Sequence, residues 1–254
     1  MALEALAEPT VAGEPKAGGR KAAQLPFLIP RRRMHAGSTW AVAHSPAAPW
    51  NGLGASSRDW SIRLAIKRGI DLSLAGLLLA LAAVPMLLLS ILIKLTSRGP
   101  VFYRQERVGL GGRIFTMLKF RTMVENAEAL TGPIWCQKND PRRTAIGTFM
   151  RQFCLDELPQ LINVLRGEMS LIGPRPERPF FVKKFAQAMP GYTARHQVRP
   201  GLTGLAQIHG LRGNTSIEQR LERDLRYIAD WSLSLDLYIL LITPIRVLVD
   251  KNGY

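Results

Sequence analysis

The feature that most constrains the fold is an apolar run from Leu72 to Ile93, which holds 22 residues without a charged side chain. Because a helix rises about 1.5 Å per residue, one helix over this run would cross the hydrocarbon core of a bilayer. Pro85 lies inside the run and is expected to kink or break the helix. Both flanks are basic, with Lys67 and Arg68 before the run and Lys94 and Arg98 after it. Positive charge is typical of the cytoplasmic side of a membrane, so both ends are predicted to lie there.

These observations predict a helix–break–helix hairpin over about residues 68–96, that is, a re-entrant helix that enters one leaflet and turns back at Pro85. A kinked helix that spans the membrane is an alternative that the residues leave open. A buried helix of a soluble protein is another, although a charge-free run of this length is typical of membrane segments.

The composition divides the chain into two predicted parts. Residues 1–60 are rich in Ala, Pro and Gly without a sustained apolar period, and we expect a mostly disordered N-terminal extension there. This part holds seven basic and four acidic residues, so residues 61–254 carry +12 of the net charge of +15. Such a basic folded part favours an anionic partner, which could be a membrane surface, a phosphorylated substrate or a nucleic acid.

The rest of the chain alternates short strand and helix patterns. Strands are expected at Val101–Tyr103 and Ile114–Phe120 around a Gly-rich turn at 109–112, and helices around Glu125–Leu130, over Phe180–Met189 and from a capping box at Thr215–Glu218. Residues 195–209 indicate a loop followed by a possible strand. The apolar stretch Trp231–Val249 is interrupted by charged residues and Pro244, which favours a helix lying on the membrane. The predicted fold class is α+β and mostly helical: a Pro-broken re-entrant helix, a short β-hairpin and amphipathic interfacial helices around a cytoplasmic catalytic core.

The segment from Arg151 to Pro176 holds the candidate chemistry. Its middle predicts a short helix, since apolar residues recur at Leu158, Leu161, Ile162 and Leu165. Pro159 is tolerated only in a first turn, so this helix should begin close to Asp156, and Arg166-Gly167 should end it.

Asp156 and Glu157 would then lie at the positive end of this helix. Arg151 lies one turn upstream and Arg175 lies in a Gly-Pro-Arg-Pro loop downstream. Two acids and two arginines at a helix start suit a metal-bound phosphate. The alternative is that Asp156 is only a helix cap. Cys154 lies nearby, but no spacing supports a nucleophilic role, and a small buried residue is the better interpretation.

From about Ile66 to Val249 the chain resembles the bacterial sugar transferases, the monotopic phosphoglycosyl transferases. Six blocks carry the resemblance in order: Lys67-Arg68 with Asp71, Gly99-Pro100-Val101-Phe102, Lys119-Phe120-Arg121-Thr122-Met123, Leu155-Asp156-Glu157-Leu158-Pro159-Gln160-Leu161, Gly173-Pro174-Arg175-Pro176, and Arg199-Pro200-Gly201-Leu202-Thr203-Gly204.

The resemblance implies transfer of a sugar 1-phosphate from a UDP-sugar to undecaprenyl phosphate with release of UMP, as the initiating membrane step of exopolysaccharide or glycan assembly. It implies Mg²⁺ as cofactor, anionic membrane lipid as a partner, and a catalytic core on the cytoplasmic face of a bacterial inner membrane. It makes Asp156 the nucleophile, which forms a covalent aspartyl phospho-sugar. The phosphate-binding residues would be Lys119, Arg121, Arg151, Arg175 and Arg199, and Asp156 and Glu157 would lie at the metal.

The resemblance has two departures. The family's helix break is often Ser-Pro, whereas this chain has Val84-Pro85, and many relatives carry N-terminal membrane helices and a soluble domain where this chain has residues 1–60. Gly132–Trp135 and Trp231–Asp236 resemble segments of hexose-1-phosphate transferases of exopolysaccharide pathways, so the transferred sugar is expected to be glucose or galactose. A homodimer is possible. A non-catalytic basic membrane scaffold or a nucleic-acid-binding protein is the alternative function. No nucleic-acid partner is expected, because the aromatic residues are not interleaved with the charges as a base-stacking surface needs.

Overall fold

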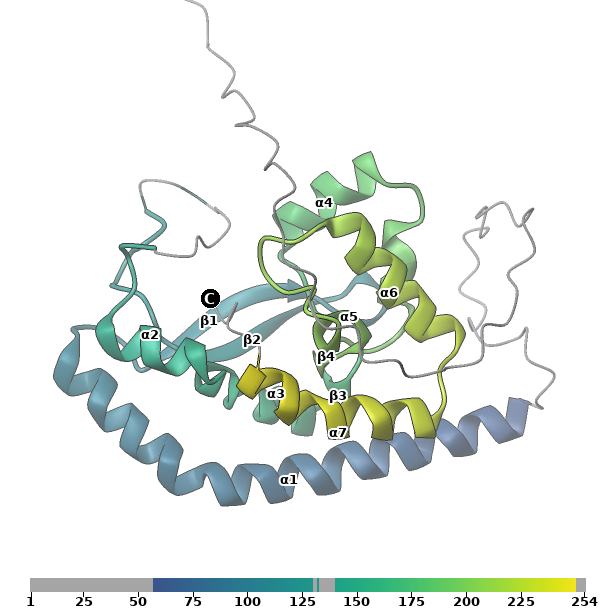
Figure 1. Cartoon of the computed structure of the whole chain (residues 1–254), viewed down its shortest axis with the longest axis horizontal. Helices are drawn as coiled ribbons and strands as arrows, with labels where there is room; N and C mark the ends of the chain where they lie inside the picture. The colour runs from purple at the N-terminus through teal and green to yellow at the C-terminus, as the bar shows by residue number, and fades with distance from the viewer. Residues whose placement is uncertain (1–56, 130–131, 133–139, 250–254) are drawn as a thin grey trace, which may run out of the picture. The chain divides into compact units, whose positions relative to one another are not determined.

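A computed structural model describes residues 57–129, 132 and 140–249 of the chain. The predictions for residues 1–56, and most of Gly132–Trp135, lie outside the described residues. The helices are α1 (Ser57–Thr96), α2 (Ala145–Gln152), α3 (Gln160–Arg166), α4 (Pro179–Ala188), α5 (Leu205–Ile208), α6 (Ile217–Ala229) and α7 (Leu233–Val249). The strands are β1 (Phe102–Val108), β2 (Ile114–Phe120), β3 (Ser170–Ile172) and β4 (Gly201–Thr203) (Figure 1). The described part is therefore mostly helical, as predicted.

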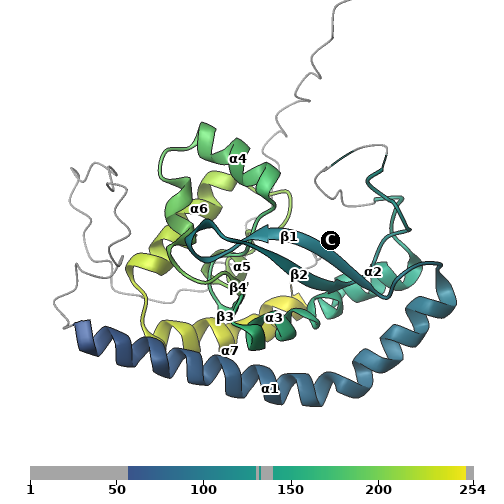
Figure 2. The ribbon, with the colours of Figure 1, turned by 180° about the vertical axis from the view of Figure 1, so that it is seen from behind.

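The apolar run forms one helix and is not interrupted at Pro85. Helix α1 continues from Ser57 to Thr96 with the proline inside it, and Figures 1 and 2 show that it curves along its length. Proline removes one main-chain hydrogen bond and pushes against the preceding turn, which bends a helix without having to end it. The predicted break at Pro85 is thus a bend within a continuous helix.

The N-terminal half of α1 is bonded to the rest of the fold by polar side chains. Lys67 Nζ lies 2.7 Å from Asp236 Oδ2 of α7, and it also donates to the Ile172 carbonyl at 3.2 Å. Arg68 donates to the Val164 carbonyl at the C-terminal end of α3 at 2.8 Å, and Asp71 accepts from the main-chain NH of Leu171 at 3.0 Å. The Lys67-Arg68 and Asp71 block therefore attaches α1 to three other elements.

The C-terminal end of α1 is attached to the same folded unit. Leu89 and Ile93 pack with Phe120 of β2 and Met150 of α2 in a small buried cluster. Arg121 donates to the Ser97 carbonyl at 2.9 Å, just beyond the end of the helix. Both ends of the apolar run are therefore bonded to one body of protein.

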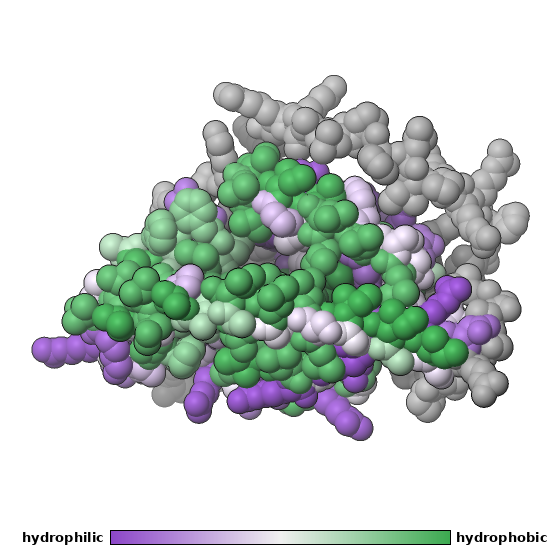
Figure 3. Space-filling view, turned by 90° about the horizontal axis from the view of Figure 1, so that it is seen from below, coloured by the Kyte–Doolittle hydropathy of each residue, from purple (hydrophilic) through white to green (hydrophobic). Residues whose placement is uncertain are grey.

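Between these attachments α1 presents an apolar surface to its surroundings. By length and composition the helix could cross a membrane, and only 11% of its most apolar stretch of 18 residues is buried. Leu81 is 67% exposed and Val84 66%. Helix α7 adds exposed residues such as Leu241 and Leu248, and Figure 3 shows a broad hydrophobic surface on this side with hydrophilic side chains at its margins.

Strands β1 and β2 form the predicted antiparallel hairpin, and β1 is longer than expected. Phe102 pairs with Phe120 and Val108 with Ile114, and a 3₁₀ turn at Leu110–Gly112 joins them. Strands β3 and β4 form a second, parallel pair. It brings Gly173 so close to the Arg199 carbonyl that a Cβ on Gly173 would lie 2.4 Å away. The loop with Arg175 and the segment from Arg199 to Gly204 are two of the motifs that carry the family resemblance. They pack against each other where Gly173 and Gly201 leave no room for a side chain.

Several local predictions need correction. Residues 125–129 form turns and not a helix. The possible strand within residues 195–209 is present as the short β4, but the residues after it form helix α5. Ser216, not Thr215, caps α6, because its hydroxyl accepts from the main-chain NH of Gln219 at 3.2 Å. Predicted helix α4 is present over Pro179–Ala188, and Trp231–Val249 is helical from Leu233.

Candidate functional site

The two candidate acids lie in a tight turn directly before α3. Residues Leu155–Glu157 form a 3₁₀ turn, Pro159 is the N-cap of α3, and α3 itself begins at Gln160, later than predicted. Gly167 ends the helix as expected, with φ of 82°. Asp156 is the N-cap of neither helix, and the cap positions before the turn and before α3 make no side-chain capping bond. The interpretation of Asp156 as a helix cap is therefore wrong.

The turn is entered through a strained residue. Cys154 precedes it with φ of 55° and ψ of 21°, in the left-handed region that residues with a side chain rarely occupy. Burial raises the pKa of its thiol, and the nearby Glu157 carboxylate adds to this shift. The residue was predicted to be small and buried, but it is only partly buried and lines the pocket described below, where Arg212 NH1 lies 3.5 Å from its Sγ.

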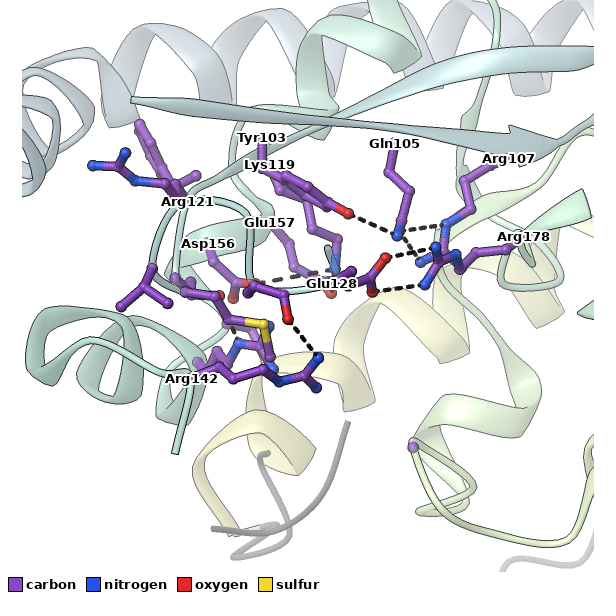
Figure 4. A pocket seen from close by; sticks show the side chains of 18 of the residues that line it. Tyr103, Gln105, Arg107, Lys119, Arg121, Glu128, Arg142, Asp156, Glu157 and Arg178 are labelled. Atoms are coloured by element: carbon purple, nitrogen blue, oxygen red, sulfur yellow. Dashed lines mark hydrogen bonds and ion pairs between the residues drawn. The ribbon is translucent and has the colours of Figure 1, made fainter. Parts of the chain in front are cut away.

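Glu157 is bound by two cations from elements far away in the chain. Lys119 Nζ of β2 lies 2.8 Å from Glu157 Oε1. The Arg175 guanidinium contacts both carboxylate oxygens, with NH1 3.1 Å from Oε2 and NH2 on Oε1. Figure 4 shows Lys119 and Glu157 close together inside a pocket. Hydrogen bonds between ionised partners are among the stronger ones in proteins, so this triad fixes β2, the turn and the loop after β3 relative to one another.

Asp156 is buried beside this triad but makes a looser contact. Its Oδ2 lies 4.0 Å from Lys119 Nζ, outside hydrogen-bonding distance, and the residue is 6% exposed. Burial raises the pKa of its carboxyl, and the charge of Lys119 opposes the shift while that of Glu157 adds to it. Loss of hydration therefore outweighs the attraction of the nearby cations in setting the pKa of this carboxyl.

Glu157 shows the opposite behaviour. Burial by itself would raise its pKa, but the charges of Arg175 and Lys119 and their hydrogen bonds hold it well below the usual range. Burial lowers the pKa of Lys119, and Glu157 counteracts that shift. The site therefore contains one carboxylate neutralised by two cations next to one carboxylate whose charge is poorly compensated.

The pocket around these groups has a volume of about 600 Å³. Among the described residues, nine cationic and five acidic side chains line it. The structure brings together the predicted residues Lys119, Arg121, Arg151, Asp156, Glu157 and Arg175 at this pocket. It also adds cations that the sequence analysis missed: Arg107, Arg142, Arg178, Arg212 and Arg220. An excess of cations around a buried acid suits an anionic ligand with several charges.

Three predicted phosphate-binding arginines differ in where the structure puts them. Arg151 lines the pocket and donates from Nε to the Thr122 hydroxyl at 2.8 Å. Arg121 lines the pocket but donates to the Ser97 and Arg98 carbonyls at the end of α1, and Figure 4 shows its guanidinium pointing away from Lys119 and Glu157. Arg199 is absent from the described lining of the pocket and donates to the Gly167 carbonyl at 3.0 Å, beyond α3. The segment that contains Arg199 lies beside the Arg175 loop, but the Arg199 side chain hydrogen-bonds to the C-terminal end of α3 instead of facing the pocket.

The residues fit a magnesium ion that takes most of its ligands from a substrate. Within the described ranges, no group of three or more His, Cys, Asp or Glu residues could hold a metal alone. Mg²⁺ commonly uses one or two protein carboxylates together with phosphate oxygens and water. Asp156 offers uncommitted oxygens, while Glu157 is bonded to Lys119 and Arg175. Asp156 and Glu157 would therefore hold the ion only together with a bound phosphate.

The arrangement can support attack by a carboxylate on a phosphorus atom. A carboxylate with little charge compensation is a competent nucleophile, and the surrounding cations can neutralise the charge that develops on phosphate oxygens. Arg175 and Lys119 line the same pocket as Asp156, so a phosphate bound beside Asp156 would lie close to both cations.

Comparison with known sequences agrees with this chemistry. A sequence model of the family described as "Bacterial sugar transferase" matches residues 62–250. A UDP-glucose:undecaprenyl-phosphate glucose-1-phosphate transferase of Escherichia coli (strain K12) is 43% identical over 195 residues, which cover 74% of this chain and 41% of that protein.

Two further relatives show the range of donors. A protein of the same name from Caulobacter vibrioides is 47% identical over 194 residues, covering 74% of this chain and 72% of the relative. A UDP-N-acetylgalactosamine-undecaprenyl-phosphate N-acetylgalactosaminephosphotransferase of Aeromonas hydrophila is 45% identical over 190 residues, covering 74% and 44%. The chain thus spans less than half the length of the Escherichia coli and Aeromonas relatives and most of the length of the Caulobacter one.

Proposed function

Because the chain belongs to the bacterial sugar transferase family, we propose that it transfers a sugar 1-phosphate from a UDP-sugar to undecaprenyl phosphate and releases UMP. The names of the relatives support both substrates. The reaction would be an initiating membrane step of exopolysaccharide or glycan assembly. The relatives give no support to the alternative of a non-catalytic scaffold or a nucleic-acid-binding protein.

The observation that carries this proposal is that two adjacent acids, Asp156 and Glu157, differ in how closely cations bind them. Glu157 is bonded to Lys119 and Arg175, whereas Asp156 lies 4.0 Å from the nearer of these cations and faces the same pocket. A nucleophile needs free lone pairs, and a phosphate site needs cations kept in place before the substrate arrives. Glu157 supplies the second requirement, and Asp156 supplies the first.

The reaction follows from these positions in two steps. An Asp156 carboxylate oxygen attacks the phosphorus that bears the sugar, the bond from that phosphorus to the bridging oxygen breaks, and UMP leaves with the bridging oxygen. An oxygen of the lipid phosphate then attacks the same phosphorus, and the acyl phosphate bond breaks to restore the Asp156 carboxylate. In both steps Arg175, Lys119 and Arg151 are placed to neutralise charge on the phosphoryl oxygens.

The donor is proposed to be UDP-glucose. Relatives named for this donor are 43% and 47% identical to the chain. The Aeromonas relative, named for UDP-N-acetylgalactosamine, is 45% identical and keeps that donor as the second candidate.

Magnesium is proposed as the cofactor on the basis of the oxygen-rich site. When bound, it would neutralise charge on the diphosphate. Asp156 and Glu157 would hold the ion only when the UDP-sugar is bound, because the two carboxylates need phosphate oxygens to complete its coordination.

A membrane location with the pocket on the cytoplasmic face is proposed from the attachments of α1. Lys67 and Asp71 bind the folded unit before the apolar run, and Ser97 binds it afterwards. A single compact unit lies on one side of a bilayer, so both ends of the run would lie on that side as well. The exposed apolar residues between them, such as Leu81 and Val84, would enter the near leaflet. In this way a bent helix can be re-entrant without a break.

The re-entrant topology can be tested with engineered cysteines in a background in which Cys136 and Cys154 are replaced by serine. Single cysteines at Ile62 and at Arg98 should both react with a membrane-impermeant maleimide from the cytoplasmic side of inverted vesicles. Neither should react from the outside of intact spheroplasts. Labelling of the two positions from opposite sides would show that α1 spans the membrane.

The proposed magnesium ion, held by two carboxylates together with the diphosphate of the UDP-sugar, predicts that activity depends on the metal. UMP release from UDP-glucose and undecaprenyl phosphate should vanish in excess EDTA and return when Mg²⁺ is restored. Because the ion is expected to bind together with the diphosphate, its apparent affinity should rise with donor concentration. Unchanged turnover in chelator would remove magnesium from the proposed reaction.

The role of Asp156 is tested by trapping the intermediate. Purified protein incubated with ¹⁴C-labelled UDP-glucose without lipid acceptor should acquire one labelled phospho-glucose, which peptide mass spectrometry should locate on Asp156. Asp156→Asn keeps the size of the side chain, and it should trap no label and lose turnover by about a thousandfold or more, as expected when a nucleophile is removed.

The matched control for this experiment is Glu157→Gln, which changes the adjacent acid in the same way. Because Gln can no longer hold Arg175 and Lys119 as ion pairs, turnover should fall, yet some adduct on Asp156 should still form. An adduct on another residue, or turnover retained in Asp156→Asn, would disprove the nucleophile assignment.

A further inference from the structure

Helix α6 carries a buried polar stripe that the proposed reaction does not use. Arg220, Asp224 and Tyr227 follow one another at helical spacing, and each is at most 5% exposed. Buried charges are costly unless they are paired and hydrogen-bonded, so three such residues on one helix face need partners with a defined purpose. Each of them reaches the loop that contains Arg175, directly or through one other side chain. Arg220 also donates to the Gly213 carbonyl, and Tyr227 to Asp236.

The stripe reaches this loop at three successive points. The Tyr227 hydroxyl lies 3.1 Å from the Ile172 carbonyl. Arg220 NH1 lies 3.0 Å from Glu177 Oε1 at the other end of the loop. Between them, Asp224 acts through Arg195, which belongs to the 3₁₀ helix Tyr192–Gln197.

Arg195 joins the stripe to the main chain of Arg175 itself. Its Nε lies 3.1 Å from Asp224 Oδ2, its NH2 contacts the same oxygen, and that NH2 also donates to the Arg175 carbonyl at 2.8 Å. The Tyr192 hydroxyl accepts from NH1 at 2.9 Å. Both side chains of the ion pair are 2% exposed, so the link is shielded from water and held in one geometry.

The loop depends on outside donors because of its sequence. Pro174 and Pro176 have no main-chain NH, so the loop cannot bond to itself as a regular element would. The Pro174 carbonyl accepts from Gly201 N at 2.9 Å and the Pro176 carbonyl from Arg107 NH1 at 2.8 Å. The Arg175 carbonyl, between these two, is held by Arg195. The direction of the Arg175 side chain is therefore set by bonds to its neighbours and, at its own carbonyl, by one buried ion pair.

We propose that the Arg195–Asp224 ion pair is a positioning device for Arg175: it fixes the main chain of the loop so that the Arg175 guanidinium reaches Glu157 and the diphosphate of the donor. The inference rests on the proposed function, because Arg175 is given its phosphate-binding role there. Arg195 and Asp224 are not among the described residues that line the pocket of about 600 Å³, so in this proposal they act only through Arg175.

A double-mutant cycle on the first half-reaction tests this proposal. The rate of adduct formation with labelled UDP-glucose, without lipid acceptor, is measured for Asp224→Asn, Arg175→Lys and the double variant. Each single change should slow adduct formation by about tenfold or more, because a misdirected guanidinium no longer meets the phosphoryl oxygens. The double variant should be no slower than Arg175→Lys, since the ion pair acts through a group that is already altered.

A matched control lies on the same helix. Arg226 and Asp230 form an exposed pair four residues apart, with Nε 3.5 Å from Oδ2. Asp230→Asn should therefore leave the rate of adduct formation within about twofold of the original. If Asp224→Asn does not fold, as judged by its thermal melting, Tyr192→Phe takes its place, because it removes only the hydroxyl that accepts from Arg195.

The outcomes are distinct. Losses that multiply in the double variant would show that Asp224 supports the fold in general and would overturn the positioning role alone. An unchanged rate in Asp224→Asn, or in Tyr192→Phe where that variant replaces it, would overturn it as well. An unchanged rate in Arg175→Lys would overturn both this inference and the role of Arg175 in the proposed function.

Discussion

The structure depends on one partly buried carboxylate, that of Glu157, which holds two cations together. Without Glu157, Lys119 of β2 and Arg175 of the loop after β3 would repel each other inside a pocket that already contains an excess of positive charge. With Glu157 they form a triad that joins the hairpin, the turn before α3 and the loop. The same arrangement leaves Asp156 as the carboxylate with accessible oxygens. The environments of these two adjacent residues push their pKa values in opposite directions, which supports the proposed roles of Glu157 as a structural ion-pair partner and Asp156 as the nucleophile.

The long helix places this chemistry at an apolar surface. Its two ends are bonded to one folded unit, through Lys67 and Asp71 on one side and through Ser97 on the other, while its middle exposes apolar side chains. Arg121 links the two features, because it lines the pocket and also binds the carbonyls at the end of α1. The proposed reaction of a water-soluble nucleotide sugar with a lipid phosphate needs a charged pocket linked to a hydrophobic face in this way.

Local patterns in the sequence predicted the elements whose causes are local. The stripe of α3 with its end at Gly167, the strand Ile114–Phe120 and helix α4 could be predicted because turns and periodicity determine them. Residues whose role depends on distant partners could not be. Arg107 and Arg220 reach the pocket through tertiary contacts that have no local signal, and Arg199 lies in a recognisable block but bonds to the end of α3. Pro85 was expected to kink or break α1, and the helix continues through it, because a proline can bend a helix without ending it. The polar positions of α6 would normally indicate a solvent-facing side, but Arg220 and Asp224 are buried on partners far along the chain.

The central claim is that Asp156 carries the phospho-sugar between donor and acceptor. The most direct test is a chase of the isolated intermediate. Protein labelled with ¹⁴C-glucose phosphate is separated from all nucleotide and then mixed with undecaprenyl phosphate alone. We predict that the label leaves the protein and appears as undecaprenyl diphosphate glucose, without any UDP-glucose in the mixture. Label that stays on the protein, or that appears only as free glucose 1-phosphate, would contradict the account, because the adduct would then not be an intermediate of the transfer.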